Sequence, residues 1–202
     1  HAGLPNRRRS QKPLEQRLSL AKTRKALMPD LLTHYATSLL IATRALPLRH
    51  AALLALVGLL PDVDALLKIH RSATHSLVLV AAAAPAIPAL KRRAKHAALA
   101  LAIYALHIAL DVFTAPTPAL WPILGESYAI TIKVDGAVAD KIAIAPHIEI
   151  NAEPTHFTRV QAVEGPIVST TGLVVATTTA TLLATEYANR RHRQCPAHCP
   201  AP

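Results

Sequence analysis

The chain has 202 residues, of which 51% are hydrophobic but only 3% aromatic and 17% charged. It is long enough for one domain, and its Ala, Leu, Val and Ile gather into runs between short basic or Pro-containing breaks, which is typical of an integral membrane protein. A formal charge of +10 ordinarily indicates nucleic acid or anionic lipid as a partner, but eight Lys or Arg against one Glu place +7 of it in residues 1–27. We therefore expect membrane lipids as partners and no specific nucleic acid.

Two polar tails flank the apolar part of the chain. Residues 1–27 are a basic N-terminal extension that is either disordered or not native, because Met28 is the sole methionine and MPDLLTH would make a natural start. Residues 189–202 are a basic, Cys- and Pro-containing tail. Its cysteines, Cys195 and Cys199, are too few ligands for a structural zinc site, even with the histidine between them.

Residues 28–113 contain four apolar segments joined by short polar breaks, which predicts a four-helix core. Asp30 is placed to cap the first helix. Pro61 ends or disturbs the second segment, and Pro85 and Pro88 interrupt the third. We expect helices at Leu31–Leu46, Ala51–Leu60, His75–Leu90 and His96–Phe113.

The pattern changes after the fourth helix. Residues 114–165 form a loop in which apolar residues alternate with small or polar ones on both sides of an Asp135–Gly136 turn, so we expect a β-hairpin there. Residues 166–188 form a C-terminal apolar helix, from Pro166 to Tyr187. The predicted fold class is mainly α: a polytopic membrane helical bundle, with a small β-hairpin region between helices four and five.

The polar residues of the core recur at positions that a bundle would bring together. Short loops make sequential helices antiparallel neighbours, so the start of helices one and three and the end of helices two and four share one side. Six histidines and aspartates fall on that side, and the basic turns fall on the other. The six are His34, Asp62, Asp64, His75, His107 and Asp111.

These residue types at this spacing favour a metal site. His107 and Asp111 are four apart and share a helix face, where they can chelate one ion. The alternative is a buried histidine hydrogen-bonded to a neighbouring aspartate. Mixed His/Asp ligation suits Zn, Mn or Fe better than Mg, and we expect one or two divalent ions, with Zn in first place. An Asp that is not a ligand, Asp62 or Asp64, would be the catalytic base.

Other polar residues have weaker assignments. His70 is a ligand, a neighbour of the ligands or a solvated linker residue, and Arg71 beside it is placed to bind an anionic substrate oxygen. His147, Glu149 and His156, in the loop region, are further residues that would complete a site.

Four blocks, MPDLLTHYATS, GLLPDVD, HRSATHSL and ALHIALD, resemble in order and spacing the membrane-bound metal-dependent hydrolase family, whose best-known bacterial member is a LexA-regulated inner-membrane protein. The resemblance covers about residues 28–125. That family is distantly similar to zinc-dependent phospholipase C and the single-strand nuclease group, which are helical enzymes with clustered zinc ions. The usual HRG is HRS in this chain, and no later HxxxE would hold a third ion.

The resemblance implies roles for individual residues. It implies that His75, His107 and Asp111 bind metal, with Asp111 as a bridge between ions. It also implies that His34 serves a second ion and that Asp62 or Asp64 is a ligand or a general base.

The bias of Lys and Arg predicts the orientation. Nine basic residues lie at the basic-turn side, whereas residues 114–166 carry six acidic and three basic residues, so the basic side should be cytoplasmic and the polar cluster extracytoplasmic. We expect a multi-pass membrane enzyme that hydrolyses a phosphoester, either a lipid or a small molecule such as a head group. The alternative is a non-enzymatic membrane protein that binds or carries divalent metal ions.

Overall fold

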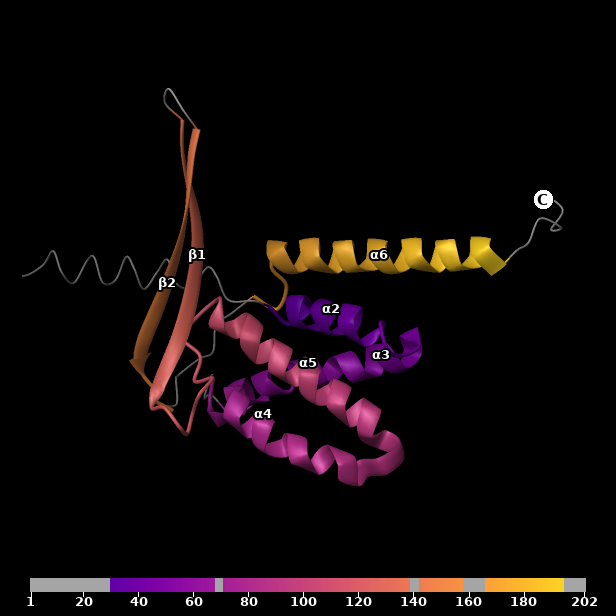
Figure 1. The fold of residues 1–202 in the computed structure, drawn as a ribbon, viewed down its shortest axis with the longest axis horizontal. Helices are drawn as coiled ribbons and strands as arrows, with labels where there is room; N and C mark the ends of the chain where they lie inside the picture. Colours follow the sequence, from indigo (N-terminus) through magenta and orange to yellow (C-terminus); the bar gives the residue numbers. More distant parts are fainter. Residues whose placement is uncertain (1–29, 68–70, 139–141, 158–165, 195–202) are drawn as a thin grey trace, which may run out of the picture.

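The computed structural model describes residues 30–67, 71–138, 142–157 and 166–194. These residues form a helical body with a long two-stranded hairpin standing across one end (Figure 1). The extensions at residues 1–27 and 195–202, with both cysteines, lie outside the described residues. The helices are α2 (Leu31–Ala42), α3 (Leu48–Ala55), α4 (Leu77–Ala83), α5 (Ala94–Val112) and α6 (Thr170–Gln194), the 3₁₀ helices are η3 (Leu56–Leu59), η4 (Pro61–Leu67), η5 (Ala73–His75) and η6 (Ala84–Arg93), and the strands are β1 (Glu126–Val138) and β2 (Ile142–Pro154).

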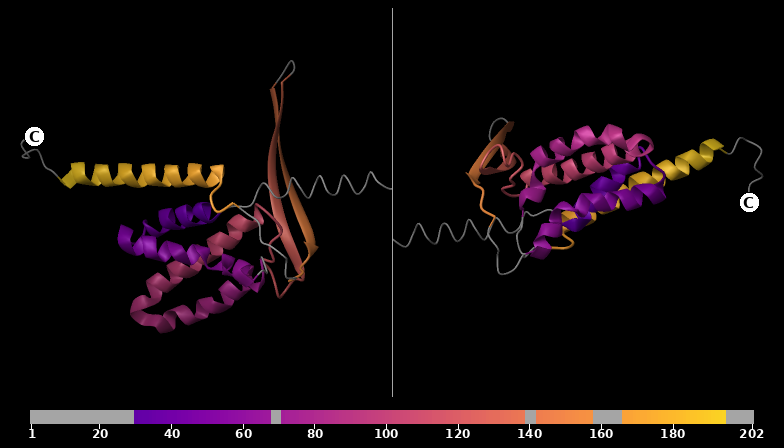
Figure 2. Two further views of the ribbon diagram at one scale, coloured as in Figure 1. Left: turned by 180° about the vertical axis from the view of Figure 1, so that it is seen from behind. Right: turned by 90° about the horizontal axis from the view of Figure 1, so that it is seen from below.

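Asp30 fixes the start of two helices. Its carboxylate accepts the Thr33 N–H at 2.7 Å as the N-cap of α2, as the sequence predicts, and it also accepts the backbone N–H of Ser169, directly before α6. Gly172 presses against the same carboxylate, where a Cβ would overlap it. Asp30 therefore joins the start of α6 to α2, and the two helices run side by side (Figures 1 and 2).

The second predicted helix, Ala51–Leu60, is α-helical only to Ala55 and continues as η3 and, after Pro61, as η4. Pro61 has no N–H to donate to an α-helical ladder, which agrees with this change. Gly58 of η3 lies so close to α2 that a Cβ would overlap the Ser38 hydroxyl. The close approach of η3 to α2 is therefore possible only because residue 58 lacks a side chain.

The third and fourth helices form an antiparallel helical hairpin. The third was expected to run from His75 to Leu90, but α4 ends at Ala83 and η6 follows, because prolines 85 and 88 cannot donate to the α ladder. The turn is made at Lys91, whose φ of 45° lies in the left-handed region, and α5 then runs back along α4 and η6 (Figure 1). Ile103 of α5 packs with Ala42 and Ala51 in the small core of the helical body.

The strands pair as a regular antiparallel hairpin between α5 and α6, so the predicted hairpin is confirmed. Its predicted turn is wrong. Asp135 pairs with Ala145 and Gly136 with Ile144, and both strands continue to Val138 and Ile142. The apolar alternation therefore extends the register beyond the Asp-Gly pair, and it overrides the local turn signal.

One helical stretch among the described residues, 77–112, is long and apolar enough to cross a membrane. Only 22% of its apolar window is buried, whereas the core helix of a water-soluble protein is mostly buried. Since the chain turns at Lys91, this stretch has two arms, and α5 alone has 19 residues, about 28 Å of helix. The mainly helical fold with a small hairpin is confirmed, and the polytopic bundle stays a prediction.

Replacing Gly58 with alanine should destabilise the protein by about 1–3 kcal/mol, because the new methyl group would overlap Ser38 and press on Ile103. Thermal unfolding of the detergent-purified protein measures this change. Gly125→Ala is the matched control, since a Cβ there has no neighbour within 4 Å in the described structure. Equal unfolding temperatures for the two variants would show that η3 and α2 are not in this close contact.

Candidate metal centre

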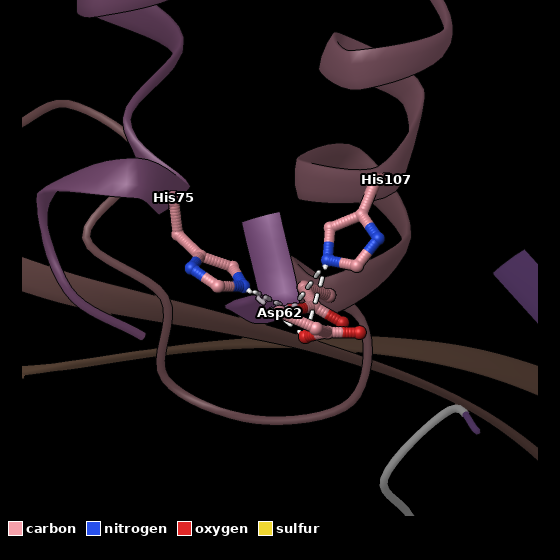
Figure 3. Close-up of side chains that lie close together, drawn as sticks. Asp62, His75 and His107 are labelled. Carbon is pink, nitrogen blue, oxygen red and sulfur yellow. Dashed lines mark ion pairs between the residues drawn. The ribbon is translucent and has the colours of Figure 1, made fainter. Parts of the chain in front are cut away.

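All six polar residues that the sequence places at one end of the bundle do meet there. The two aspartates of η4 face the last two turns of α5, the end of η5 and the first turn of α2. Four of the six form a compact group of ligand atoms, all within 4.8 Å of one another, and Figure 3 shows three of them. The group consists of Asp62, His75, His107 and Asp111.

The nitrogen and oxygen atoms of this group alternate around a small central space. The Nε2 atom of His75 lies 3.6 Å from Asp62 Oδ1 and 3.3 Å from Asp111 Oδ2. The Nε2 atom of His107 lies 3.5 Å and 3.6 Å from the same two oxygens. Ligands about 2.0–2.1 Å from a tetrahedral zinc ion lie ~3.3–3.4 Å apart. The four nitrogen–oxygen separations are close to this value, and the group could hold one first-row divalent ion.

Both imidazole rings are held so that Nε2 faces the centre. His107 Nδ1 donates to the Gly58 carbonyl at 2.7 Å, and because a carbonyl can only accept, Nε2 of the neutral ring keeps its lone pair. His75 Nδ1 lies 3.3 Å from Asp64 Oδ2. Partners of this kind on the far nitrogen orient histidine ligands in metal sites and raise their basicity.

Asp64 belongs to this supporting layer and not to the four-atom group. Its Oδ2 also accepts the Ser72 N–H at 2.7 Å and the Thr74 hydroxyl at 2.9 Å. Ser72 is itself the N-cap of η5, the turn that carries His75. Asp64 therefore fixes both the backbone and the ring of His75. Its predicted role as catalytic base stays a prediction.

His34 also lies behind the group. Its Nε2 is 3.3 Å from Asp111 Oδ1, and its ring stacks on His107 with centroids 3.9 Å apart. The structure thus directs Oδ1 of Asp111 toward His34 and leaves Oδ2 for the centre. Among the described residues, no other ligand side chain accompanies His34 in a group that could hold a second ion. Its predicted role as a ligand of a second ion remains a prediction.

Arg71 is buried beside the group, and His70 lies outside the described residues. Arg71 Nε is 3.5 Å from Asp111 Oδ2, and its other nitrogens bond the Thr114 hydroxyl at 3.2 Å and the Pro116 carbonyl at 3.5 Å. Its φ of 56° is a left-handed conformation that costs a non-glycine residue about 1–3 kcal/mol. The strained backbone of Arg71 thus accompanies a guanidinium held against Asp111. Its predicted role in binding a substrate oxygen stays a prediction.

The charges of this region require compensation. Three buried or half-buried carboxylates, Asp62, Asp64 and Asp111, and one guanidinium sum to −2 when the histidines are neutral, which one divalent cation would balance. His107 Nε2 and Asp111 Oδ2 are buried and make no hydrogen bond within the described part of the chain. Buried polar atoms normally have partners, so an ion is a natural occupant.

The pKa values of Asp62 and His75 are shifted in opposite directions by burial and by their neighbours. Burial would raise the pKa of Asp62, but its contacts with His107 and His75 hold that pKa well below its usual range. Burial would lower the pKa of His75, but Asp111, Asp62 and Asp64 raise it above its usual value. A proton on His75 thus offsets one of the two unbalanced negative charges without a metal, and a cation must displace it.

One group of the site had no recognisable signal in the sequence. The Gly58 carbonyl that orients His107 comes from an apolar stretch, and a backbone acceptor cannot be read from residue types. The loop residues predicted to complete a site lie elsewhere: His147 pairs with Asp135 and Glu149 with Lys133 on the exposed hairpin, and His156 is exposed.

These features define a class, a helical protein with a buried His/Asp cluster at one end that could hold a metal ion. A family model described as YdjM inner membrane protein matches residues 28–190, and the chain belongs to that family. No curated protein and no solved structure matches. The membrane-protein part of the resemblance is confirmed, and the similarity to zinc-dependent phospholipase C stays a prediction.

Replacing His107 with alanine should abolish metal binding, because it removes one of the four ligand side chains of the group. The Gly58 carbonyl and the stacked ring of His34 hold this side chain in place. The matched control is His96→Ala, an exposed histidine at the other end of the same helix. Elemental analysis of the purified proteins should find a stoichiometric metal in the wild type and control and none in His107→Ala. Metal retained by both variants would place the ion elsewhere.

Replacing Asp64 with asparagine should weaken metal binding about 10–100-fold without removing a ligand, since the amide is a poorer acceptor for His75. Competition with a chromogenic chelator measures the affinity. Asp135→Asn, an exposed change on the hairpin, should leave it unaltered. An unchanged affinity in Asp64→Asn would contradict the orienting role.

Proposed function

We propose that this protein is a membrane-bound metal-dependent hydrolase that acts on a phosphoester. The observation that carries the proposal is the uneven exposure of the four ligand side chains. His75, His107 and Asp111 are at most 3% exposed, whereas Asp62 is 19% exposed. Catalytic zinc sites keep three protein ligands and an open position, whereas structural sites are closed by four.

The residues divide into holding and reacting roles on this proposal. His75, His107 and Asp111 hold the cation, with Asp64, His34 and the Gly58 carbonyl fixing their orientation. Asp62 lies at the solvent-accessible side, where its carboxylate is placed to accept a proton from an entering water molecule. A divalent cation, Zn first with Mn or Fe as alternatives, would supply Lewis acidity toward a phosphoryl oxygen.

The position of the site supports a substrate at the membrane surface. His107 and Asp111 lie in the last two turns of α5, at the opposite end from the basic turns that carry Arg44 and Lys91–Lys95. The positive-inside rule would make the basic end cytoplasmic and the metal centre extracytoplasmic in a multi-pass arrangement. A site at the end of a membrane helix faces head groups, so a phospholipid or a related head-group phosphoester is the proposed substrate class.

The second candidate is a protein that binds or carries divalent ions without turnover. It is favoured by the position of Asp62, which offers a fourth ligand atom within 4.8 Å of the other three. A carrier requires polar groups along a path through the helices, whereas these lie at one end. Asp62 therefore decides between the two: it is a base next to an open position, or it is a fourth ligand.

Asp62→Asn should keep the metal but lower turnover of a phosphodiester by about 10²–10⁴-fold, because the amide cannot take a proton. Bis(p-nitrophenyl) phosphate and head-group release from phospholipid vesicles are the two assays, and elemental analysis is run on the same samples. Chelation should abolish wild-type turnover and added zinc or manganese should restore it. Loss of the metal from Asp62→Asn, with no wild-type turnover in either assay, would favour the ion-binding candidate.

A further inference from the structure

The hairpin between α5 and α6 has two faces of different chemistry. Residues directly opposite in the antiparallel register share a face, and the pairs Ile130–Ile150, Ile132–Ile148 and Gly136–Ile144 form one that is apolar. The alternate pairs Lys133–His147 and Thr131–Glu149 form the other, with ion pairs from Lys133 to Glu149 and from His147 to Asp135. The ribbon is thus amphipathic over most of its length.

The apolar face has no cover within the described structure. Ile132, Val134, Ile144, Ile148 and Ile150 are each between 58% and 69% exposed. An isolated two-stranded hairpin is at best marginally stable in water, and contiguous exposed apolar patches of this kind mark interaction surfaces. Something outside this part of the chain must therefore contact the face.

The placement of the hairpin indicates what contacts its apolar face. The strands run across the end of the helical body, crosswise to α6, and do not continue the direction of the helices (Figures 1 and 2). In a protein of an inner-membrane family, an element that crosses the end of a membrane helix lies along the bilayer surface. Apolar residues are also exposed in the segment before β1 and in η4, at Ile123, Leu124 and Leu66.

We propose that the hairpin is a membrane-interface ribbon, which lies flat on the bilayer with its isoleucine face among the upper acyl chains and its charged face in water. This assignment is independent of the proposed hydrolase activity. Full insertion is excluded by physical chemistry: the outer edges of a two-stranded ribbon have unpaired backbone groups, which hydrocarbon cannot satisfy and which water and head groups at the interface can. Thirteen-residue strands of about 43 Å would also carry the Lys133–Glu149 pair into the core.

The bilayer is favoured over a second copy of the chain by the chemistry of the surrounding surface. A sheet-on-sheet interface needs a polar rim around a compact apolar centre. Here further apolar side chains are exposed in other segments, at Ile123 and Leu66, which are 73% and 82% exposed. Exposed apolar side chains in several segments of an inner-membrane family protein are what an acyl-chain region would cover.

The test uses adjacent residues on opposite faces. Ile148 is 68% exposed and the Glu149 side chain 53%, so without a partner both positions would be similarly accessible. Ile148→Cys and Glu149→Cys are made in the full chain with Cys195 and Cys199 replaced by serine, and each is labelled with bimane. The proteins are placed in nanodiscs at one copy per disc, with and without brominated phosphatidylcholine.

The label on Ile148→Cys should shift to the blue and lose most of its fluorescence to the brominated lipid, whereas the label on Glu149→Cys should keep its emission. Equal, unquenched emission from both labels would overturn the proposal. Shielding of the first label that occurs only in vesicles containing many copies, together with disulfide cross-links between copies of the unlabelled Ile148→Cys protein, would also overturn it and assign the face to a dimer. Thermal unfolding of each labelled variant confirms that the hairpin change has not unfolded the chain.

Discussion

The structure depends on a concentration of negative charge at one end of an apolar helical body. Asp62, Asp64 and Asp111 converge on His75, which is fully buried, and Arg71 offsets only one of the three charges. Desolvating carboxylates is costly unless they are paired, hydrogen-bonded or bound to a metal. The surrounding architecture supplies those partners from four separate segments, so the geometry of the helices and the electrostatics of the centre cannot be varied independently.

Much of the centre could be predicted from the sequence because antiparallel connectivity is a strong constraint. One helix has His34 in its first turn, and another has His107 and Asp111 in its last two turns. When the loops are short, these two helix ends must lie at the same end of the bundle. The division of labour among the six residues could not be predicted. Whether Asp62 or Asp64 faces the centre depends on the 3₁₀ path after Pro61, where a small change of backbone exchanges neighbouring side chains.

The fold was less predictable where local signals competed with longer-range ones. The Asp135–Gly136 pair has the residues of a tight turn, yet the register carries Gly136 opposite Ile144, since cross-strand apolar pairs continue beyond it. In the helical hairpin, Pro85 and Pro88 predict the interruption of the helix. The turn itself falls at Lys91, in a left-handed conformation that its residue type does not favour.

The metal centre and the hairpin share one end of the molecule, and this has a physical consequence. Nineteen residues of α5 are about as long as the hydrocarbon thickness of a bilayer, so in a membrane-spanning α5 Asp111 near its end would lie close to head-group depth. A ribbon along the same surface would hold that end at a fixed height, because tilting it would either expose its isoleucines or bury Lys133. The depth of the Asp62 side would then be set by the hairpin, and a phosphoester at the interface could reach it without crossing the hydrocarbon.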